Sequence, residues 1–95
     1  MLIIAGYITV PADRRQAFVD AFAELVVRAR AYPGCLDLAI TADPVDPARV
    51  NNYELWRSEA DLDAWRKVSR PPKTGIPIES DQVMKYFISG SAPPF

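Results

Sequence analysis

The sequence predicts a single α+β domain whose elements follow the order β-α-β-β-α-β. Residues 2–10 form an apolar, β-rich run that ends at Pro11. Apolar side chains then recur at helical spacing from Phe18 to Ala29, and residues 36–41 alternate between apolar and polar side chains. The first spacing is typical of an amphipathic helix and the second of a half-buried strand. With 95 residues in all, one domain with one core is expected.

The first helix has a recognisable beginning and end. Asp13, followed three residues later by Gln16, is typical of a capping box, so one helix of about five turns is expected to begin there. Pro33-Gly34 ends the segment before the strand at residues 36–41.

The second half repeats the pattern. After the turn "DPVDPAR", the stretch "NNYELW" (residues 51–56) has strong strand formers and predicts a strand. Ser58 and Asp61 form a second capping box, which opens a helix. The proline-rich "RPPKTGIP" excludes regular structure, residues 83–89 predict the last strand, and a tail occupies residues 89–95.

This order is the ferredoxin-like split pattern, with a four-stranded antiparallel sheet and two helices on one face. The first and third strands should lie at its centre. The first strand is apolar on both faces, with Ile4 and Ile8 on one side and Ile3 and Tyr7 on the other. A monomer would leave one apolar face in water. The sequence therefore predicts a homodimer that packs sheet against sheet.

Composition argues against several classes of function. The net charge of -1 leaves no basic excess for nucleic acid. Cys35 is alone, which favours a reducing, cytoplasmic compartment. The apolar N-terminus lacks the flank and length of a signal or a membrane span. Without histidine, a zinc site or a Ser-His or Cys-His nucleophile is not expected. No glycine-rich nucleotide motif occurs, so no cofactor and no metal are predicted.

One strand face carries the candidate site. Side chains alternate along a strand, so Asn52, Glu54 and Trp56 point the same way, toward the helices. Each could be satisfied internally, Glu54 by an arginine and Trp56 as core. Three such residues together favour a ligand pocket, because buried polar groups without partners are costly. Glu54 is the only carboxylate on this face and the predicted base.

The segments "LIIAGYITVPADRRQAF", "YPGCLDLAI" and "VNNYELWRS" resemble the antibiotic biosynthesis monooxygenase (ABM) domain family. The resemblance extends from about Leu2 to Ser89. It implies a dimeric α+β barrel and, for the polyketide members, cofactor-free oxidation of phenolic polycyclic substrates to quinones by O2. Other members are quinol monooxygenases, isomerases or haem-degrading enzymes. The haem-degrading members use an axial histidine, which this chain lacks.

The family's site maps onto this chain in part. Asn52 and Trp56 match an asparagine and a tryptophan four residues apart, which implies that both bind the reacting oxygen. Leu62 stands where the polyketide members have tyrosine, and Arg70 is nearest to an expected arginine. We expect Asn52, Trp56 and Glu54 to be catalytic and Leu62, Trp65 and Arg70 to bind a small aromatic substrate.

A basic cluster stands at the end of the second helix, and two alternative functions stay open. The cluster is either a solvated helix end or a positive rim that attracts an anionic substrate; it comprises Arg66, Lys67, Arg70 and Lys73. The same pocket would also suit a non-catalytic small-molecule-binding protein or an isomerase of a small carbonyl metabolite.

Overall fold

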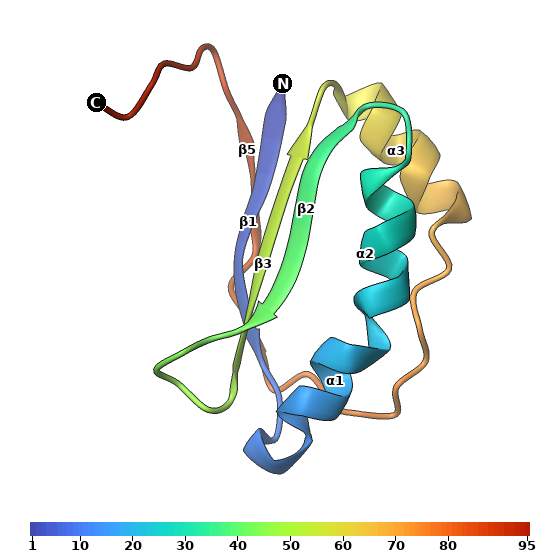
Figure 1. The fold of residues 1–95 in the computed structure, drawn as a ribbon, viewed down its shortest axis with the longest axis vertical. Coiled ribbons are helices and arrows are strands. Elements are labelled where there is room, and N and C mark those ends of the chain that lie inside the picture. Colours follow the sequence, from blue (N-terminus) through green and yellow to red (C-terminus); the bar gives the residue numbers. More distant parts are fainter.

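The computed structural model describes residues 1–95, and its helices all pack on one face of an antiparallel sheet (Figure 1). The predicted ferredoxin-like α+β architecture is confirmed. The elements are, in order, β1 (Leu2–Thr9), a 3-10 turn (Ala12–Arg14), α1 (Arg15–Ala21), α2 (Ala23–Arg30), β2 (Cys35–Ala42), β3 (Arg49–Trp56), α3 (Glu59–Val68), β4 (Ser80–Asp81) and β5 (Met84–Phe87).

The sheet is arranged around β1 and β3, as the sequence predicts. The order is β2-β3-β1, and both β4 and β5 pair with the free side of β1. In the β1–β3 ladder, Leu2 pairs with Trp56, Ile4 with Glu54 and Gly6 with Asn52. These pairs share the helix-facing side of the sheet, because directly opposite residues point the same way. The predicted polar face of β3 therefore does lie toward the helices.

The last strand, β5, is shorter than the strand expected at residues 83–89, and a separate piece, β4, which the sequence did not predict, precedes it. The two pieces are separated by Gln82 and Val83, which stand opposite Tyr7 and Gly6 with no residue inserted, since the register is the same on both sides. The Gln82 amide donates to the Tyr7 carbonyl (2.8 Å). We call this local departure of residues 82 and 83 from the ladder the bulge. Gly6 has a φ of +145°, and a Cβ there would lie 2.1 Å from the Gln82 carbonyl oxygen. This close approach of the two backbones requires glycine at position 6.

The first helix is also different from the expected one. It breaks at Phe22, whose amide bonds back to the Val19 carbonyl (3.1 Å) in a tighter turn. The chain enters through a 3-10 turn, in which the Arg14 amide donates to Pro11. No side chain caps α1, so the predicted capping box at Asp13 is wrong. At α3 the predicted cap is confirmed, since Ser58 Oγ accepts from the Asp61 amide (3.1 Å).

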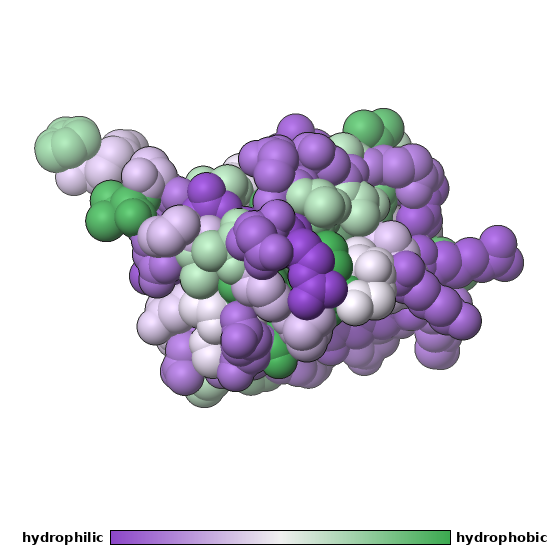
Figure 2. Space-filling model, turned by 90° about the horizontal axis from the view of Figure 1, so that it is seen from below, coloured by the Kyte–Doolittle hydropathy of each residue, from purple (hydrophilic) through white to green (hydrophobic).

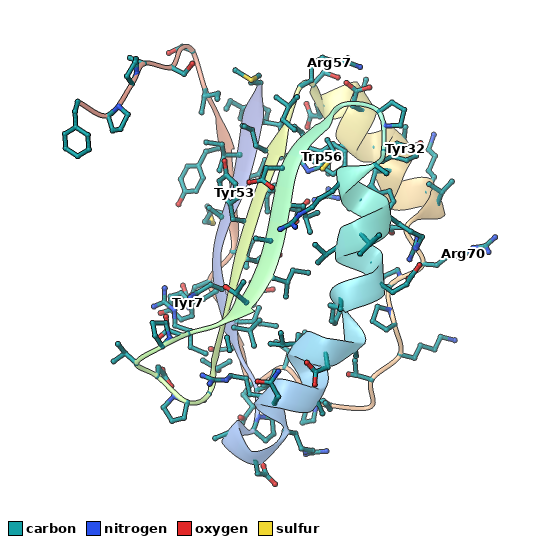
Figure 3. The ribbon with its side chains drawn as sticks, viewed as in Figure 1. Tyr7, Tyr32, Tyr53, Trp56, Arg57 and Arg70 are labelled. Carbon is teal, nitrogen blue, oxygen red and sulfur yellow. The ribbon has the colours of Figure 1, made fainter.

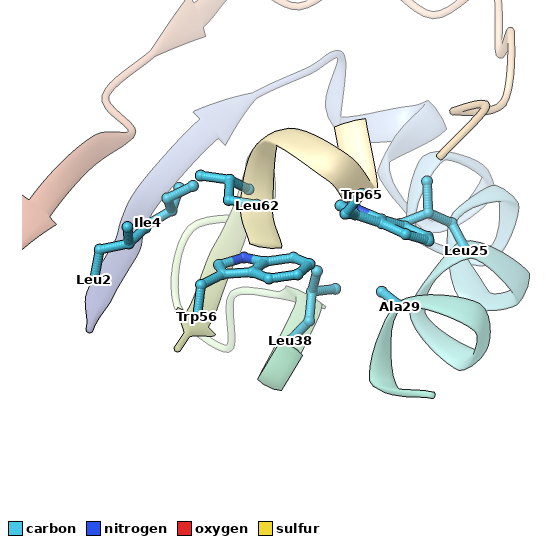
Figure 4. Packing of buried hydrophobic residues seen from close by; sticks show 8 residues of the cluster. All are labelled: Leu2, Ile4, Leu25, Ala29, Leu38, Trp56, Leu62 and Trp65. Carbon is cyan, nitrogen blue, oxygen red and sulfur yellow. The ribbon is translucent and has the colours of Figure 1, made fainter. Parts of the chain in front are cut away.

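The main hydrophobic core lies between the sheet and the helices (Figure 4). The Trp56 indole packs among residues of β2 and α3, and its ring centroid lies 6.4 Å from that of Trp65. The eight buried members are Leu2, Ile4, Leu25, Ala29, Leu38, Trp56, Leu62 and Trp65. Three more buried residues, Val10, Phe18 and Val50, extend this layer toward α1.

The opposite face of the sheet carries no helix. Tyr7 and Tyr53 lie on this side, away from the helices (Figure 3). Tyr53, Met84 and Tyr86 are 36%, 59% and 52% exposed, so the apolar face that the sequence predicts is present. Viewed from below, at the end of the β2–β3 hairpin, the surface is by contrast mostly hydrophilic, with hydrophobic residues interspersed (Figure 2).

The connector from α3 to β4 (residues 70–79) crosses the molecule without joining the sheet until its last residue. Its first backbone hydrogen bond to the sheet is that of Glu79 to the Thr9 carbonyl (2.8 Å). Ile76 packs against the Val10–Phe18–Val50 cluster. No helix of the structure has the length and apolar character that crossing a membrane requires.

Candidate active site

A cavity of about 280 Å³ lies between the sheet, α1 and the residues that follow α3. Its wall is mostly apolar, with polar groups contributed by β3, α3 and β4. The lining residues are Ile4, Ile8, Phe18, Phe22, Ile40, Val50, Asn52, Glu54, Arg66, Ile78, Asp81 and Val83. A cavity with few polar groups in an apolar wall is the usual form of a small-molecule site.

Local sequence explains why the cavity occurs here. On the helix-facing side of β1, Gly6 contributes no side chain to the row that it shares with Asn52. The bulge opposite Gly6 adds Val83 to the wall. From the other side, Phe18 and Phe22 enclose the space, and their ring centroids are 4.9 Å apart. The glycine, the bulge and the aromatic pair together leave room between sheet and helix.

Glu54 is the centre of the polar part of the wall. Asn52 Nδ2 donates to Glu54 Oε2 (3.2 Å), and Trp56 Nε1 donates to Glu54 Oε1 (2.9 Å). Both donors stand two residues from Glu54 on the same strand, so the period-two geometry of β3 places all three on one face. No arginine or lysine pairs with this carboxylate. Each oxygen keeps a second lone pair for a ligand.

The Glu54 charge also acts on the single cysteine. Burial raises the pKa of the Cys35 thiol, and the negative charges of Glu54 and then Asp37 raise it further. The thiol therefore stays protonated at neutral pH, and its Sγ donates weakly to the Asp37 carbonyl (3.6 Å). A protonated thiol is a poor nucleophile, so Cys35 offers no covalent chemistry here.

The structure separates the predicted site residues into two groups. Asn52 and Glu54 line the cavity, whereas Trp56 is fully buried beside it and reaches it only through its bond to Glu54. Leu62 and Trp65 are core residues outside the lining. The predicted catalytic roles of Asn52, Glu54 and Trp56 and the predicted substrate-binding roles of Leu62 and Trp65 stay predictions.

Arg66, and not Arg70, is the basic residue at the cavity. Arg70 is exposed, has a φ of +47° and points away from the sheet (Figure 3). Arg66 lies four residues after Leu62 on α3 and reaches the lining. This spacing could have identified Arg66 from the sequence, because residues four apart share a helix face and Leu62 was a predicted site residue. Ile78 and Asp81 had no such signal, since the connector lacks periodicity.

The acidic side chains are not arranged as a metal site. No group of three or more potential ligand side chains comes together. Asp43 accepts hydrogen bonds from the amides of Asp46 and Val45 and from the Asn51 side chain, which together lower its pKa to about 2. Its role is to hold the β2–β3 turn, as Asp-Pro turns usually require.

The fold and the cavity define a class: a ferredoxin-like protein with a small-ligand cavity between its sheet and helices. The model of the antibiotic biosynthesis monooxygenase family matches residues 1–69. The chain belongs to this family.

Solved structures share the same fold. A proposed antibiotic biosynthesis monooxygenase from Nitrosomonas europaea superposes with a TM-score of 0.80 at 20% identity, over 95% of this chain and 100% of that chain. A haem-degrading enzyme from Mycobacterium tuberculosis, solved with two haems in its active site, superposes with a TM-score of 0.71 at 14% identity, over 98% and 100% of the two chains. At these identities the likeness is one of fold.

A curated sequence relative has no assigned activity. An uncharacterised protein from Synechocystis is 27% identical over 62 residues, which cover 65% of this chain and 42% of that protein. The chain thus spans less than half the length of this relative.

Proposed function

We propose that the protein is a cofactor-independent monooxygenase that oxidises a phenolic or quinol-type aromatic compound with O2. The observation that carries the proposal is Glu54. It is a carboxylate with no cationic partner, held by two N–H donors in the wall of an otherwise apolar cavity. Such a group is oriented to accept a proton from a hydroxyl that enters the cavity. Membership of the monooxygenase family supports the reaction class.

The reaction balances without an external reductant. Glu54 takes the phenolic proton, and the phenolate passes one electron to O2. The two radicals combine at a ring carbon to form a C–O bond, and the peroxide takes the proton back from Glu54. Loss of that carbon's hydrogen and cleavage of the O–O bond then give a quinone and water. One oxygen atom of O2 enters the product, and the substrate supplies all four electrons.

Asn52 and Trp56 act through Glu54 in this scheme. Each donates one N–H to its carboxylate, so both fix the position of Glu54; Trp56 has no further donor, whereas Asn52 keeps its second N–H. The apolar wall from Phe18, Phe22 and Val50 offers water few hydrogen-bond partners, which favours the survival of reactive intermediates.

Oxygen uptake with hydroquinones and naphthols tests the proposal. Glu54→Gln keeps the shape of the side chain and removes the base, so we expect a rate loss on the order of a hundredfold, within the range for general-base catalysis. Glu79→Gln is the matched control, because Glu79 is exposed and outside the cavity. Circular dichroism must show that both variants are folded. Full turnover by Glu54→Gln would end the assignment of Glu54 as base.

The open sheet face supports a second part of the proposal, a homodimer with the two sheets face to face. Tyr53, Met84 and Tyr86 would become buried in that contact. Light scattering should give twice the chain mass of 10.6 kDa. Tyr53→Asp should dissociate the dimer, because it buries an unpaired charge. A stable wild-type monomer at micromolar concentration would contradict the sheet-to-sheet arrangement.

One observation favours a second candidate, a non-catalytic binding protein. Of the two side chains expected to stabilise a reacting oxygen, Trp56 donates its one N–H to Glu54 and Asn52 donates one of its two. This leaves a single side-chain N–H, from Asn52, for an oxyanion. Ligand binding without oxygen uptake, across phenols and quinols, would establish this alternative.

A further inference from the structure

The three charged groups of the cavity wall differ in how they are satisfied. Glu54 accepts from Asn52 and Trp56. Asp81 accepts the amide of Val83 (3.0 Å) and so holds the bulge. Arg66 has no side-chain hydrogen bond and no ion pair within the chain, with either carboxylate or with any other. The wall therefore carries one cation that is free to take an anion.

Other arginines show how unusual this is for the chain. Arg28, Arg30, Arg49 and Arg57 are each paired with a carboxylate, and Arg15 donates to backbone carbonyls at the β2–β3 turn. Arg14 and Arg70 also lack partners and, like Arg66, are exposed, but both are outside the cavity lining. Only at Arg66 does an unpaired guanidinium coincide with the cavity.

The volume limits the size of the ligand. An apolar cavity of about 150 Å³ is enough for one benzene ring. The cavity of about 280 Å³ thus has room for roughly two fused rings with substituents, and it stands at the lower edge of the usual range for ligand pockets. A linear system of three or four rings exceeds this volume and would extend out of the cavity.

From these observations we propose that the site takes an aromatic hydroxy acid of one or two rings. Its hydroxyl donates to Glu54 and its carboxylate pairs with Arg66. The hydroxyl half of this assignment rests on the proposed function. The carboxylate cannot lie in the reverse orientation without facing Glu54. Arg66 therefore sets both the class of the ligand and its direction in the cavity, since a guanidinium recognises a carboxylate through paired N–H donors.

Calorimetric titration without oxygen tests the assignment independently of turnover. The probes are a hydroxynaphthoate with its two groups on opposite rings, the naphthol that lacks the carboxylate, and a three-ring hydroxy acid. Wild-type protein should bind hydroxynaphthoate roughly tenfold more tightly than naphthol, the effect of one charge-assisted contact. The three-ring acid should bind at least as weakly as naphthol.

Arg66→Gln should weaken hydroxynaphthoate binding roughly tenfold and change naphthol binding less than about twofold. Lys67→Gln is the matched control; it removes one charge from the neighbouring exposed residue outside the lining and should change neither affinity. Equal affinity for hydroxynaphthoate and naphthol, equal effects of the two substitutions, or tight binding of the three-ring acid would overturn the inference.

The two proposals fail separately. If hydroxynaphthoate binds selectively through Arg66 but no phenol or quinol supports oxygen uptake, the monooxygenase proposal fails and the ligand class stands. If neutral naphthols are oxidised and bind as well as the acid, the ligand class fails and the reaction stands.

Discussion

Gly6→Ala should be among the most damaging single-methyl additions in this protein. The new Cβ would lie 2.1 Å from the Gln82 carbonyl oxygen and 2.8 Å from the Val83 Cα. Both are backbone atoms, so no side-chain rotation relieves the contact. The φ of +145° adds a conformational cost of about 1 to 3 kcal/mol. Displacing the bulge also breaks the bond from the Gln82 amide to Tyr7, worth about 1 kcal/mol. The expected loss is about 2 to 4 kcal/mol.

The other glycines supply controls that separate these contributions. Gly75 has a φ of +69° but nothing within 4 Å of a built Cβ, and Gly90 has neither feature. Gly75→Ala should therefore lower the free energy of unfolding by about 1 kcal/mol, because only the left-handed backbone conformation opposes the substitution. Gly90→Ala should change the free energy of unfolding by less than about 0.5 kcal/mol.

Urea denaturation measures the series. With a slope of about 1 to 2 kcal/mol per molar for a small domain, Gly6→Ala should lower the midpoint by roughly 1 to 4 M. An insoluble or unfolded variant agrees with the expectation, provided that Gly75→Ala folds. A midpoint for Gly6→Ala that equals that of Gly75→Ala would refute the reasoning, because the collision with the bulge would then cost nothing.

Three further perturbations test the local chemistry. The pKa of Asp43 is lowered from 3.8 to about 2, and that of Asp61 is also lowered. Both carboxylates therefore stabilise the fold above pH 4, and this stability is lost as the pH falls from about 4 toward 2. Asp43→Asn should reduce that loss in urea midpoints measured against pH, and an unchanged profile would contradict the expectation. Ser58→Ala removes the cap of α3 and should cost about 1 kcal/mol, whereas the exposed Ser89→Ala should cost almost nothing in the same urea assay. Trp56→Phe loses the bond to Glu54 and should be about 1 kcal/mol worse than Trp65→Phe, whose indole donates to no protein group; equal losses in urea would argue against that bond.

Local patterns were enough to predict the order of elements and the centre of the sheet. Alternation along β3 placed Asn52 and Glu54 on the helix-facing side, because a strand has only two faces and the apolar partners of the other face identify it. The cap at Ser58 followed from two residues three apart. Each of these depends on neighbours within a few positions of the chain.

What depended on distant contacts was not predictable. The break at Phe22 comes where this residue packs against both hydrophobic clusters, and the bulge at Gln82 stands opposite Gly6, far away in sequence. The choice of Arg66 over Arg70 depends on where α3 ends and on the left-handed turn at Arg70. Likewise, the hydrogen bond from Trp56 to Glu54 turned an expected ligand donor into an internal one.

The connector at residues 70–79 has a consequence for how ligand range could diverge among related chains. It supplies Ile78 to the cavity wall yet makes no backbone hydrogen bond to the sheet before Glu79. Substitutions or length changes between Arg70 and Ile78 can therefore reshape the cavity while the β-ladders that hold Glu54 stay intact. Apart from Ile76, which packs on the buried cluster, the connector can therefore change the size of the ligand while Glu54 and Arg66, on β3 and α3, keep its class.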